Sequence, residues 1–448
     1  AALLCTTQTP VKTKHCSSSF ASLIQSRAMD VLRATVTEFQ NTTPQQRRAL
    51  IAASLGWMLD AFDVMLYALV VAHIMLDLNM SKSIAGLLNT LTLLASGIGG
   101  ILFGFIADRI GRTRALMGSI LTYSICSFAS GLSTSILMLA VFRFILGLGM
   151  GGEWNTGATL VAETWPDHLR ARALSLVQSS WAIGYALAAI VAGIMLRFTN
   201  WRYAFFVGVL PALVTLWIQK DVHEPEMWRA RRRSVGAQAA AAGNEVTFGD
   251  LFSSRFARST LALLFMNLFG MFAWWGLFTW MPPYLSLPVA KGGRGFSVLN
   301  TTTLLVVLNL CGMFPGYAGF GWVADHLGRR RAFILYTLIA AVLVPLYAMA
   351  RNPAGLMILG ALVAFFGTGF FSGSGIIASE LFPTSVRARA LGFTYNGARA
   401  LSSIAPFVIG RIGERHGLGA AFYLCGFMFL LSGIVATLVP ETRGRSLE

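Results

Sequence analysis

Long apolar runs recur along this chain, and they decide what it can fold into. Each run has about 18 residues or more, enough to cross the roughly 30 Å hydrocarbon core of a bilayer as an α-helix. A helix suits lipid because it satisfies its own backbone hydrogen bonds. The sequence therefore predicts an all-α membrane protein. We identify twelve such runs, with approximate bounds 50–75, 84–107, 115–132, 135–160, 173–195, 202–219, 259–285, 299–322, 332–350, 354–379, 390–410 and 419–439.

The charged residues support this class of protein and indicate its orientation. Only 12% of the 448 residues are charged, about half of the share in soluble domains. Most of the 35 lysines and arginines fall in the tails and in the loops on one side of the membrane, while Arg143 and Arg399 fall inside helices. This asymmetry predicts cytoplasmic termini in a plasma or inner membrane. It also accounts for the net charge of +16 without nucleic-acid binding.

The chain has no pattern typical of a disulfide framework, a metal site or a secretory signal peptide. Its five cysteines are scattered and its six histidines form no ligand cluster, so we expect no metal and no cofactor. Residues 1–28 are polar and free of acids, a composition weakly similar to that of a transit peptide. We interpret them as a disordered extension, or as sequence that precedes a start at Met29.

Loop sequences repeat at a constant spacing along the chain. "GFIADRIGRTR" begins at Gly104 and "GWVADHLGRRR" begins at Gly321, 217 positions later. "AETWPDHLRARAL" begins at Ala162 and "SELFPTSVRARAL" begins at Ser379, again 217 positions later. The segments "HEPEMW" and "PETRG" match at the same spacing. Three matches at one spacing indicate that the chain consists of two similar halves in parallel orientation.

Two parallel halves of six helices are the layout of transporters whose halves rock about a site near the membrane midplane. We therefore divide the chain into a cytoplasmic tail, two six-helix halves, a polar linker between them and a second tail. We expect it to act as a monomer in the lipid bilayer. The first tail is residues 1–48 and the last tail is residues 440–448. The two halves are residues 49–219 and 259–439, and the linker between them is residues 220–258.

The repeated loop resembles a motif of the major facilitator superfamily. Gly104-x-x-x-Asp108-Arg109-x-Gly111-Arg112 is similar to its loop 2–3 motif, and Arg143-x-x-x-Gly147-x-Gly149 resembles its helix 4 motif. One departure is Thr113, where the superfamily usually has a second basic residue, and Arg114 stands next to it. The resemblance covers residues 49–448 and implies a twelve-helix transporter fold.

The same resemblance implies a conformational latch at the cytoplasmic side. Asp108 is expected to face the N-terminal end of helix 11 and to hold the outward-open state; the alternative is a simple topological anchor. The residues assigned to the latch are Gly104, Asp108, Arg109, Gly111, Arg112, Glu163 and Arg170 in the first half and Asp325, Gly328, Arg329, Glu380 and Arg387 in the second.

Four segments narrow the resemblance to one group of transporters. Asp60-x-x-Asp63, "GLGMGGEW", "ETWPDHLRARA" and "YNGARALSSIAP" together resemble the sialate:proton symporters, a group that includes transporters of lactate-like acids. The aromatic acid:proton symporters share a similar aspartate pair and the helix 11 arginine. The resemblance implies proton-coupled symport of a small organic acid anion by alternating access. Because "PETRG" resembles the ending of sugar porters, a sugar or another neutral metabolite remains an alternative.

Two aspartates stand inside the apolar stretch "GWMLDAFDVMLYALV". Asp60 and Asp63 are three residues apart and share one face of the predicted helix. Each carboxylate would cost roughly 2.5–3.5 kcal/mol at the bilayer centre. Mutual repulsion and desolvation favour a proton shared between them. We expect at least one of them to carry the proton; the alternative is that one bonds neighbouring backbone and only the other titrates.

Three further charged residues lie within predicted helices. Arg399 lies near mid-membrane and offers a fixed fork to a substrate carboxylate; the alternative is an ion pair with Asp60, Asp63 or Glu153. Glu153 could be a second proton site or the partner of Arg399. For Arg143, a structural pair is as plausible as a functional one.

Polar and aromatic side chains on four predicted helices could complete a substrate pocket; for any single aromatic, the alternative is packing or the interface belt. "GLGMGG" also matches a dinucleotide fingerprint, but that role needs a preceding strand, and glycines inside a membrane helix favour close packing. An intramembrane enzyme or receptor is a remote alternative, since no Gly-x-Ser-x-Gly or His-Glu-x-x-His motif is present. The pocket candidates are Gln178, Trp181, Tyr185, Asn267, Trp274, Trp275, Asn309, Tyr395 and Asn396.

Overall fold

The computed structural model describes residues 42–224, 251–253, 256–382 and 384–443, without the side chains of residues 108, 167, 168, 171 and 384–389. Residues 1–28 and most of the predicted linker lie outside the described residues. The division of the chain at residues 220–258 therefore stays a prediction. Residues 48–448 form one compact unit, which contains the helices from α3 onward and nearly all of α2.

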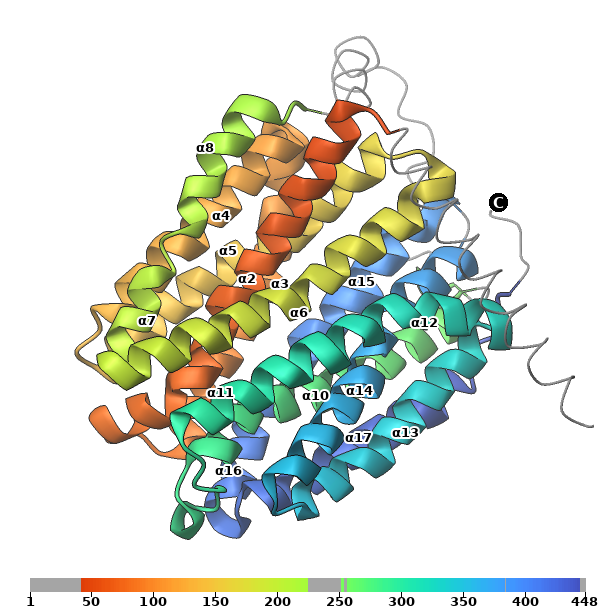
Figure 1. The fold of residues 1–448 in the computed structure, drawn as a ribbon. Helices are drawn as coiled ribbons and strands as arrows, with labels where there is room; N and C mark the ends of the chain where they lie inside the picture. The colour runs from red at the N-terminus through yellow and green to blue at the C-terminus, as the bar shows by residue number, and fades with distance from the viewer. Residues whose placement is uncertain (1–41, 225–250, 254–255, 383, 444–448) are drawn as a thin grey trace, which may run out of the picture. The chain divides into compact units, whose positions relative to one another are not determined.

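Twelve helical spans follow one another in the described residues, and each overlaps one predicted apolar run, which confirms the all-α fold (Figure 1). The first six spans are α2 (Pro44–Asp77), α3 (Lys82–Ile110), α4 (Arg112–Gly131), α5 (Ile136–Thr164), α6 (Asp167–Phe198), and α7 (Trp201–Val207) with α8 (Pro211–Asp221). The last six are α10 (Ala257–Ser286), α11 (Val298–Val307) with the π-helix η3 (Leu308–Met313) and α12 (Phe314–Leu327), α13 (Arg329–Met349), α14 (Pro353–Leu381), α15 (Thr384–Ser402) with α16 (Ala405–His416), and α17 (Leu418–Ala436). A short 3-10 turn, η2 (Val289–Lys291), follows α10.

Among the described residues, ten spans are long and apolar enough to cross a membrane by length and composition alone. The other two are α4 and the α15–α16 pair. α4 begins at Arg112 and carries several hydroxyl side chains. The α15–α16 pair contains Arg399 and is interrupted after Ser402. Both pack against helices of their own half, α4 on α5 and α15 on α10, so they complete the two six-helix halves.

Local sequence signals set where the helices begin and turn. The Ser81 hydroxyl accepts a hydrogen bond from the Ile84 backbone N–H at 3.2 Å and so caps the start of α3. Between α3 and α4 the chain turns at Gly111, whose φ of 114° favours glycine. The equivalent turn between α12 and α13 uses Gly328, with φ 97°. The two repeated loops are therefore built in the same way.

Glycines in α5 allow neighbouring helices to approach closely. A Cβ atom on Gly147 would lie 2.2 Å from the Thr92 carbonyl oxygen of α3, and one on Gly149 would lie 2.8 Å from the Tyr123 amide nitrogen of α4. These glycines therefore lie against neighbouring helices inside the first half. A dinucleotide site needs its glycines in a loop between a strand and a helix. These glycines lie inside α5 instead, so they do not form such a site.

Contacts between the two halves run along α3 and α6. α3 packs against α15 and α16, and α6 packs against α11, η3 and α12; in Figure 1, α6 and α11 run side by side. We call the end of the bundle where α3 begins the Lys82 end, and the end where α3 stops the Arg112 end. At the Lys82 end, the Lys82 ammonium donates hydrogen bonds to the carbonyl oxygens of Gly413 at 3.0 Å and Lys291 at 2.8 Å.

Candidate functional site

A narrow cavity, lined by side chains of both halves, lies between the two halves of the bundle. The first half contributes residues of α2 and α6, and the second half contributes residues of α10, α12, α14 and α15. A motion of one half against the other must therefore change the shape of this cavity. Its lining consists of Trp57, Gln178, Trp181, Met271, Trp274, Trp275, Tyr317, Phe371, Tyr395 and Arg399.

Aromatic rings form most of the cavity wall and bridge the two halves. The ring centroids of Trp57 and Trp181 are 4.7 Å apart, and those of Trp181 and Trp275 are 6.1 Å apart. In the described part of the chain, the buried indole nitrogens of Trp57, Trp181 and Trp274 have no hydrogen-bond partner. Buried donors usually find partners, so these three N–H groups are available to a bound molecule.

The sequence-predicted pocket residues divide into those that line the cavity and those that do not. Six of them line it: Gln178, Trp181, Trp274, Trp275, Tyr395 and Arg399. Among the others, the Tyr185 hydroxyl donates to the Phe278 carbonyl oxygen at 3.4 Å, and the Asn309 side-chain amide donates to the Leu305 carbonyl oxygen at 2.8 Å. The Asn267 amide donates to the Thr394 carbonyl oxygen at 3.5 Å.

Asn396 lies beside α3 rather than in the cavity wall, because a Cβ atom on Gly100 would lie 3.8 Å from its side-chain oxygen. The roles of Asn396 and of the three side chains just described in substrate binding stay predictions. Sequence reasoning missed Trp57, Met271, Tyr317 and Phe371. Only Trp57 carried a usable signal, since it stands three residues before Asp60 on the same helix face.

Among the described side chains, five charged ones are less than 5% exposed. Their exposed fractions are 1% for Asp60, 0% for Asp63, 0% for Arg143, 1% for Glu153 and 4% for Arg399. Buried charges persist only where they are compensated by other charges or by hydrogen bonds. The groups that compensate each of these five charges therefore indicate whether the residue is structural or functional.

Asp63 is held by a neighbouring helix of the same half. The Ser127 hydroxyl of α4 donates a hydrogen bond to Asp63 Oδ1 at 2.8 Å. The same oxygen lies against the break between α7 and α8, where a Cβ atom on Gly208 would be 2.4 Å away. Asp63 also interacts electrostatically with Asp60 and with Arg143. All of these partners belong to the first half.

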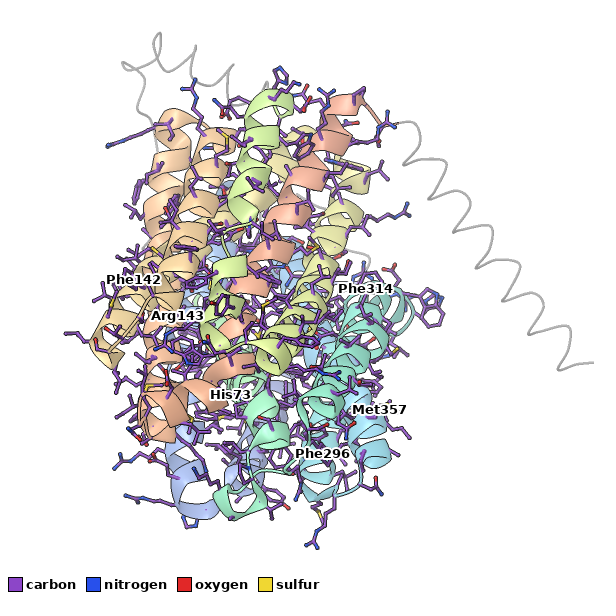
Figure 2. All side chains as sticks on the ribbon, turned by 60° about the vertical axis from the view of Figure 1, so that its left-hand side comes forward. His73, Phe142, Arg143, Phe296, Phe314 and Met357 are labelled. Atoms are coloured by element: carbon purple, nitrogen blue, oxygen red, sulfur yellow. The ribbon has the colours of Figure 1, made fainter. Side chains whose placement is uncertain are left out.

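Arg143 of α5 is labelled in Figure 2. Its guanidinium stacks over the Tyr67 ring, 4.8 Å from the ring centroid. The Tyr67 hydroxyl donates to the Ala85 carbonyl oxygen at 2.8 Å, which fixes the ring. Within the described residues none of the three guanidinium nitrogens has a hydrogen-bond partner. Cation–π attraction and the nearby aspartates therefore compensate this charge.

Asp60, Glu153 and Arg399 form a second group that spans both halves. Asp60 interacts electrostatically with Arg399, and Glu153 interacts electrostatically with both Asp60 and Arg399. Among the described residues, neither carboxylate accepts a hydrogen bond, and Arg399 Nε and Nη2 have no partner. This unsatisfied group borders the cavity through Arg399.

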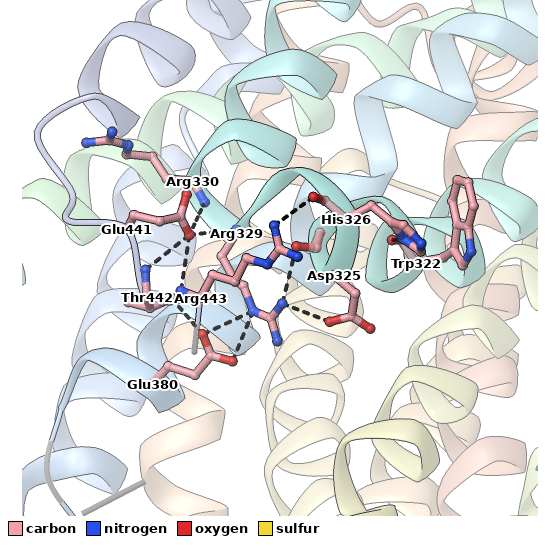
Figure 3. Close-up of polar contacts among 10 residues, drawn as sticks. Trp322, Asp325, His326, Arg329, Arg330, Glu380, Glu441, Thr442 and Arg443 are labelled. Carbon is pink, nitrogen blue, oxygen red and sulfur yellow. Dashed lines mark hydrogen bonds and ion pairs between the residues drawn. The ribbon is translucent and has the colours of Figure 1, made fainter. Parts of the chain in front are cut away.

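Charged networks at the repeated loops are built alike in the two halves. In the first half, Arg112 forms an ion pair with Glu163 (Nη2–Oε1, 3.1 Å), and Glu224 accepts a hydrogen bond from the Arg112 backbone N–H at 2.7 Å. In the second half, Arg329 takes the place of Arg112 and forms an ion pair with Glu380 (Nε–Oε1, 3.1 Å; Figure 3).

The carboxylate of Glu441 completes the second network. It accepts a hydrogen bond from the Arg329 backbone N–H at 2.8 Å, as Glu224 does for Arg112. A Cβ atom on Gly328 would lie 2.6 Å from this carboxylate, so the turn requires glycine. Sequence reasoning used Glu224 and Glu441 only as marks of the repeat and missed them as members of these networks, although their shared spacing of 217 was the signal.

Not every residue of the predicted latch is described. The side chains of Asp108 and Arg387 lie outside the described residues, so the predicted contact of Asp108 with helix 11 stays a prediction. Asp325 pairs with Arg329 at 2.8 Å, Arg109 is exposed, and Arg170 is partly buried. In the described chain, the ion pairs of the Arg112 and Arg329 networks each join helices of a single half.

Comparisons with known proteins agree with this architecture. The family model of the Major Facilitator Superfamily matches residues 53–317 and 294–447. The chain is 30% identical to the cis,cis-muconate transport protein of Acinetobacter baylyi, over 87% of this chain and 93% of that protein. It is 30% identical to the sialic acid transporter NanX of Escherichia coli K12, over 90% of this chain and 96% of that protein.

Among solved structures, the crystal structure of a D-xylose-proton symporter superposes with a TM-score of 0.73. The sequences are 20% identical, and the match covers 90% of this chain and all of that one. At this identity the match bears on the fold alone. The twelve-helix fold, the paired loop networks and the family match together show that the chain belongs to the Major Facilitator Superfamily and is a multi-pass membrane transporter rather than an enzyme.

Proposed function

We propose that this transporter is a proton-coupled symporter of a small organic acid anion. The observation that carries the proposal is the position of Arg399. Its guanidinium lines the cavity between the halves, and in the described chain two of its nitrogens lack a partner. A guanidinium presents a planar fork that fits a carboxylate with two parallel hydrogen bonds. The relatives named above, which transport muconate and sialic acid, support this substrate class.

The other residues of the cavity wall suit a substrate whose carbon skeleton, beyond the carboxylate, is flat and unsaturated. Trp57, Trp181 and Trp274 supply apolar faces for such a skeleton, and their unpartnered indole N–H groups can donate to its oxygens. Gln178 and Tyr317, which line the cavity from opposite halves, can recognise one further polar substituent. Few other polar groups line the wall, so a planar acid is favoured over a polyhydroxylated one.

The proposed cycle couples protons to the acid through the buried carboxylates near Arg399. Asp60 and Glu153 both interact with Arg399, so protonation releases the arginine for the substrate. Alternating access follows from a cavity shared by two halves, which can open toward either end of the bundle. We place the protein in a plasma or inner membrane, with both termini in the cytoplasm as the charge asymmetry predicts.

Binding and uptake by the purified protein test this proposal directly. Thermal stabilisation in detergent is measured with benzoate, cis,cis-muconate, sialic acid, lactate and D-xylose, and uptake is measured in proteoliposomes under an inward proton gradient. Changing Arg399 to Lys keeps the charge but loses the fork, so the affinity for acids should fall about 10-fold or more, using roughly 1.5–3 kcal/mol for a charged hydrogen bond. Arg399→Gln should abolish acid binding.

Arg351→Gln is the matched control, because Arg351 is an exposed arginine in the turn between α13 and α14. It should bind acids as the parent does. If Arg399→Gln binds an acid as tightly as the parent, the organic-acid proposal loses its central residue. Stabilisation by D-xylose together with no response to any acid would favour a neutral sugar as the substrate.

A further inference from the structure

The five buried charges belong to two groups that differ in where their partners stand. Asp63 and Arg143 have all of their described partners on α2, α4 and α5 of the first half and at the α7–α8 break. Both residues of this pair, and the residues that hold them, therefore belong to the first half. One acid and one base leave the pair neutral, so it needs no proton.

The second group lies across the boundary between the halves. Glu153 of α5 places its carboxylate against α2, where a Cβ atom on Gly56 would be 2.3 Å from Oε1. Gly56 and Asp60 are four residues apart and therefore stand one above the other on the same helix face. The notch left by Gly56 brings the Glu153 carboxyl group next to Asp60. Arg399 of α15 belongs to the second half and attracts both acids electrostatically.

Charge counting distinguishes this group from the first. Two carboxylates and one guanidinium would carry a net charge of −1, buried and without a hydrogen bond to either acid among the described residues. A buried charge without compensation costs much free energy, so a buried acid in that position binds a proton and becomes neutral. Two acids that interact this closely bind protons as a pair rather than singly.

Other titratable groups near this site do not change the count. Tyr123 of α4 interacts with Asp60, Asp63 and Glu153, and its hydroxyl donates to the Gly56 carbonyl oxygen at 3.4 Å. Tyr395 of α15 interacts with Arg399. Both phenols are neutral at physiological pH. Arg143 interacts with Asp60, but its charge is matched by Asp63.

We propose that Asp60 and Glu153 share one proton in the empty carrier and take up a second when a substrate carboxylate engages Arg399. The inference rests on the proposed organic-acid function and adds its stoichiometry. Before binding, one ionised acid neutralises Arg399. The substrate carboxylate replaces that acid, which then takes a proton from solvent. Each monocarboxylate is therefore carried with one proton, and its transport moves no net charge.

Proton uptake on binding tests this directly. Calorimetric titration of benzoate into the purified protein, in buffers of different ionisation enthalpy, gives the number of protons taken up per acid bound. The parent should take up one. Asp60→Asn and Glu153→Gln each leave one acid facing Arg399, so each should also take up one. The double variant has neither acid and should take up none, with binding that no longer depends on pH.

Asp77→Asn is the control, since Asp77 pairs with Arg202 at 2.8 Å at the exposed end of α2, and it should take up one proton. Loss of uptake in either single variant would assign the proton to that residue alone and overturn the inference, as would uptake by the double variant. Transport of benzoate by the parent in proteoliposomes should not respond to an imposed membrane potential, and a response would also overturn it. If no acid binds to the parent, the proposed function itself fails.

Discussion

Glu414 near the end of α16 accepts a hydrogen bond from the Ser83 backbone N–H in the first turn of α3, with Oε1 and N 3.2 Å apart. The Ser83 hydroxyl donates to the other oxygen of the same carboxylate. An acid of the second half thus caps the positive N-terminus of a helix in the first half. This contact joins the two halves at the Lys82 end.

Neutralising Glu414 should favour opening at the Lys82 end. Glu414→Gln removes a charge–dipole attraction of about 0.3–1 kcal/mol, which corresponds to a shift of up to about five-fold in population. A cysteine at position 271 in the cavity wall, in a background without native cysteines, should then react up to about five-fold faster with a membrane-impermeant thiol reagent added from the Lys82 side. Glu414→Asp keeps the charge and should react at close to the parent rate. An unchanged rate in Glu414→Gln would show that the contact does not hold this end closed.

The Glu441 network should make stability depend on pH in the acidic range. Partial burial tends to raise the pKa of Glu441, but hydrogen bonds from the backbone N–H groups of Arg443, Arg329, Arg330 and Thr442 outweigh it and hold the pKa below the ordinary value of 4.5. A depressed folded-state pKa stabilises the protein above the unfolded-state pKa, and this stabilisation disappears as the pH falls through the folded-state value.

Thermal melting of the parent and of Glu441→Gln between pH 7 and pH 3 tests that dependence. The parent should melt at a higher temperature at pH 7, and the difference should shrink as the pH falls below about 4.5. Asp325→Asn removes an exposed partner of Arg329 without touching the capped N–H groups, and it serves as the control. A difference that is the same at every pH would mean that ionised Glu441 does not stabilise the fold.

The Asp63–Arg143 pair should be structural. Asp63→Asn removes one of the two aspartates that compensate the buried Arg143 and should destabilise the protein by roughly 3 kcal/mol. A second substitution, Arg143→Gln, removes the buried cation and should recover part of that loss. Denaturation of the parent, the single variant and the double variant in detergent measures both effects. A single variant as stable as the parent would remove the pair from the structural framework.

Gly56 should control proton binding more than stability. A methyl group at this position would displace the Glu153 carboxyl, which is the flexible end of a side chain, from its place beside Asp60. Gly56→Ala should therefore shift the pH at which acid binding is half-maximal, with little change in the melting temperature. Gly375→Ala has open space around its Cβ atom and should change neither. An unaltered pH profile in Gly56→Ala would separate Glu153 from the proton site.

Orientation in the membrane can be tested with reporter fusions. The turn at Asn79 and the turn at Gly292 connect helices at the Lys82 end, and both should report an outside location. A fusion at Gly236, between α8 and α10, should report the cytoplasm, because the basic residues gather on that side. The opposite pattern would reverse the assignment of the two ends.

The sequence by itself determined the number of spans, the fold and the equivalence of the two halves. A run of about 18 apolar residues is constrained by bilayer thickness alone, and the spacing of 217 between the loops needs no structure to be seen. It also identified Arg399, Asp60 and Glu153 as candidates, because an ionisable side chain inside an apolar run is expensive. Such features depend on local composition and survive without knowledge of contacts.

Only the tertiary structure decided which of these residues meet. Helices α2 and α10 are buried on nearly all sides, so periodicity could not say which face lines the cavity, and it did not distinguish Trp57 from other tryptophans. The sequence pairs the two aspartates, yet Asp63 is held by Ser127 within one half, whereas Asp60 interacts electrostatically with Arg399 of the other. The reason is physical: a side chain's partners are set by the packing of helices far apart in sequence, which a local pattern does not encode.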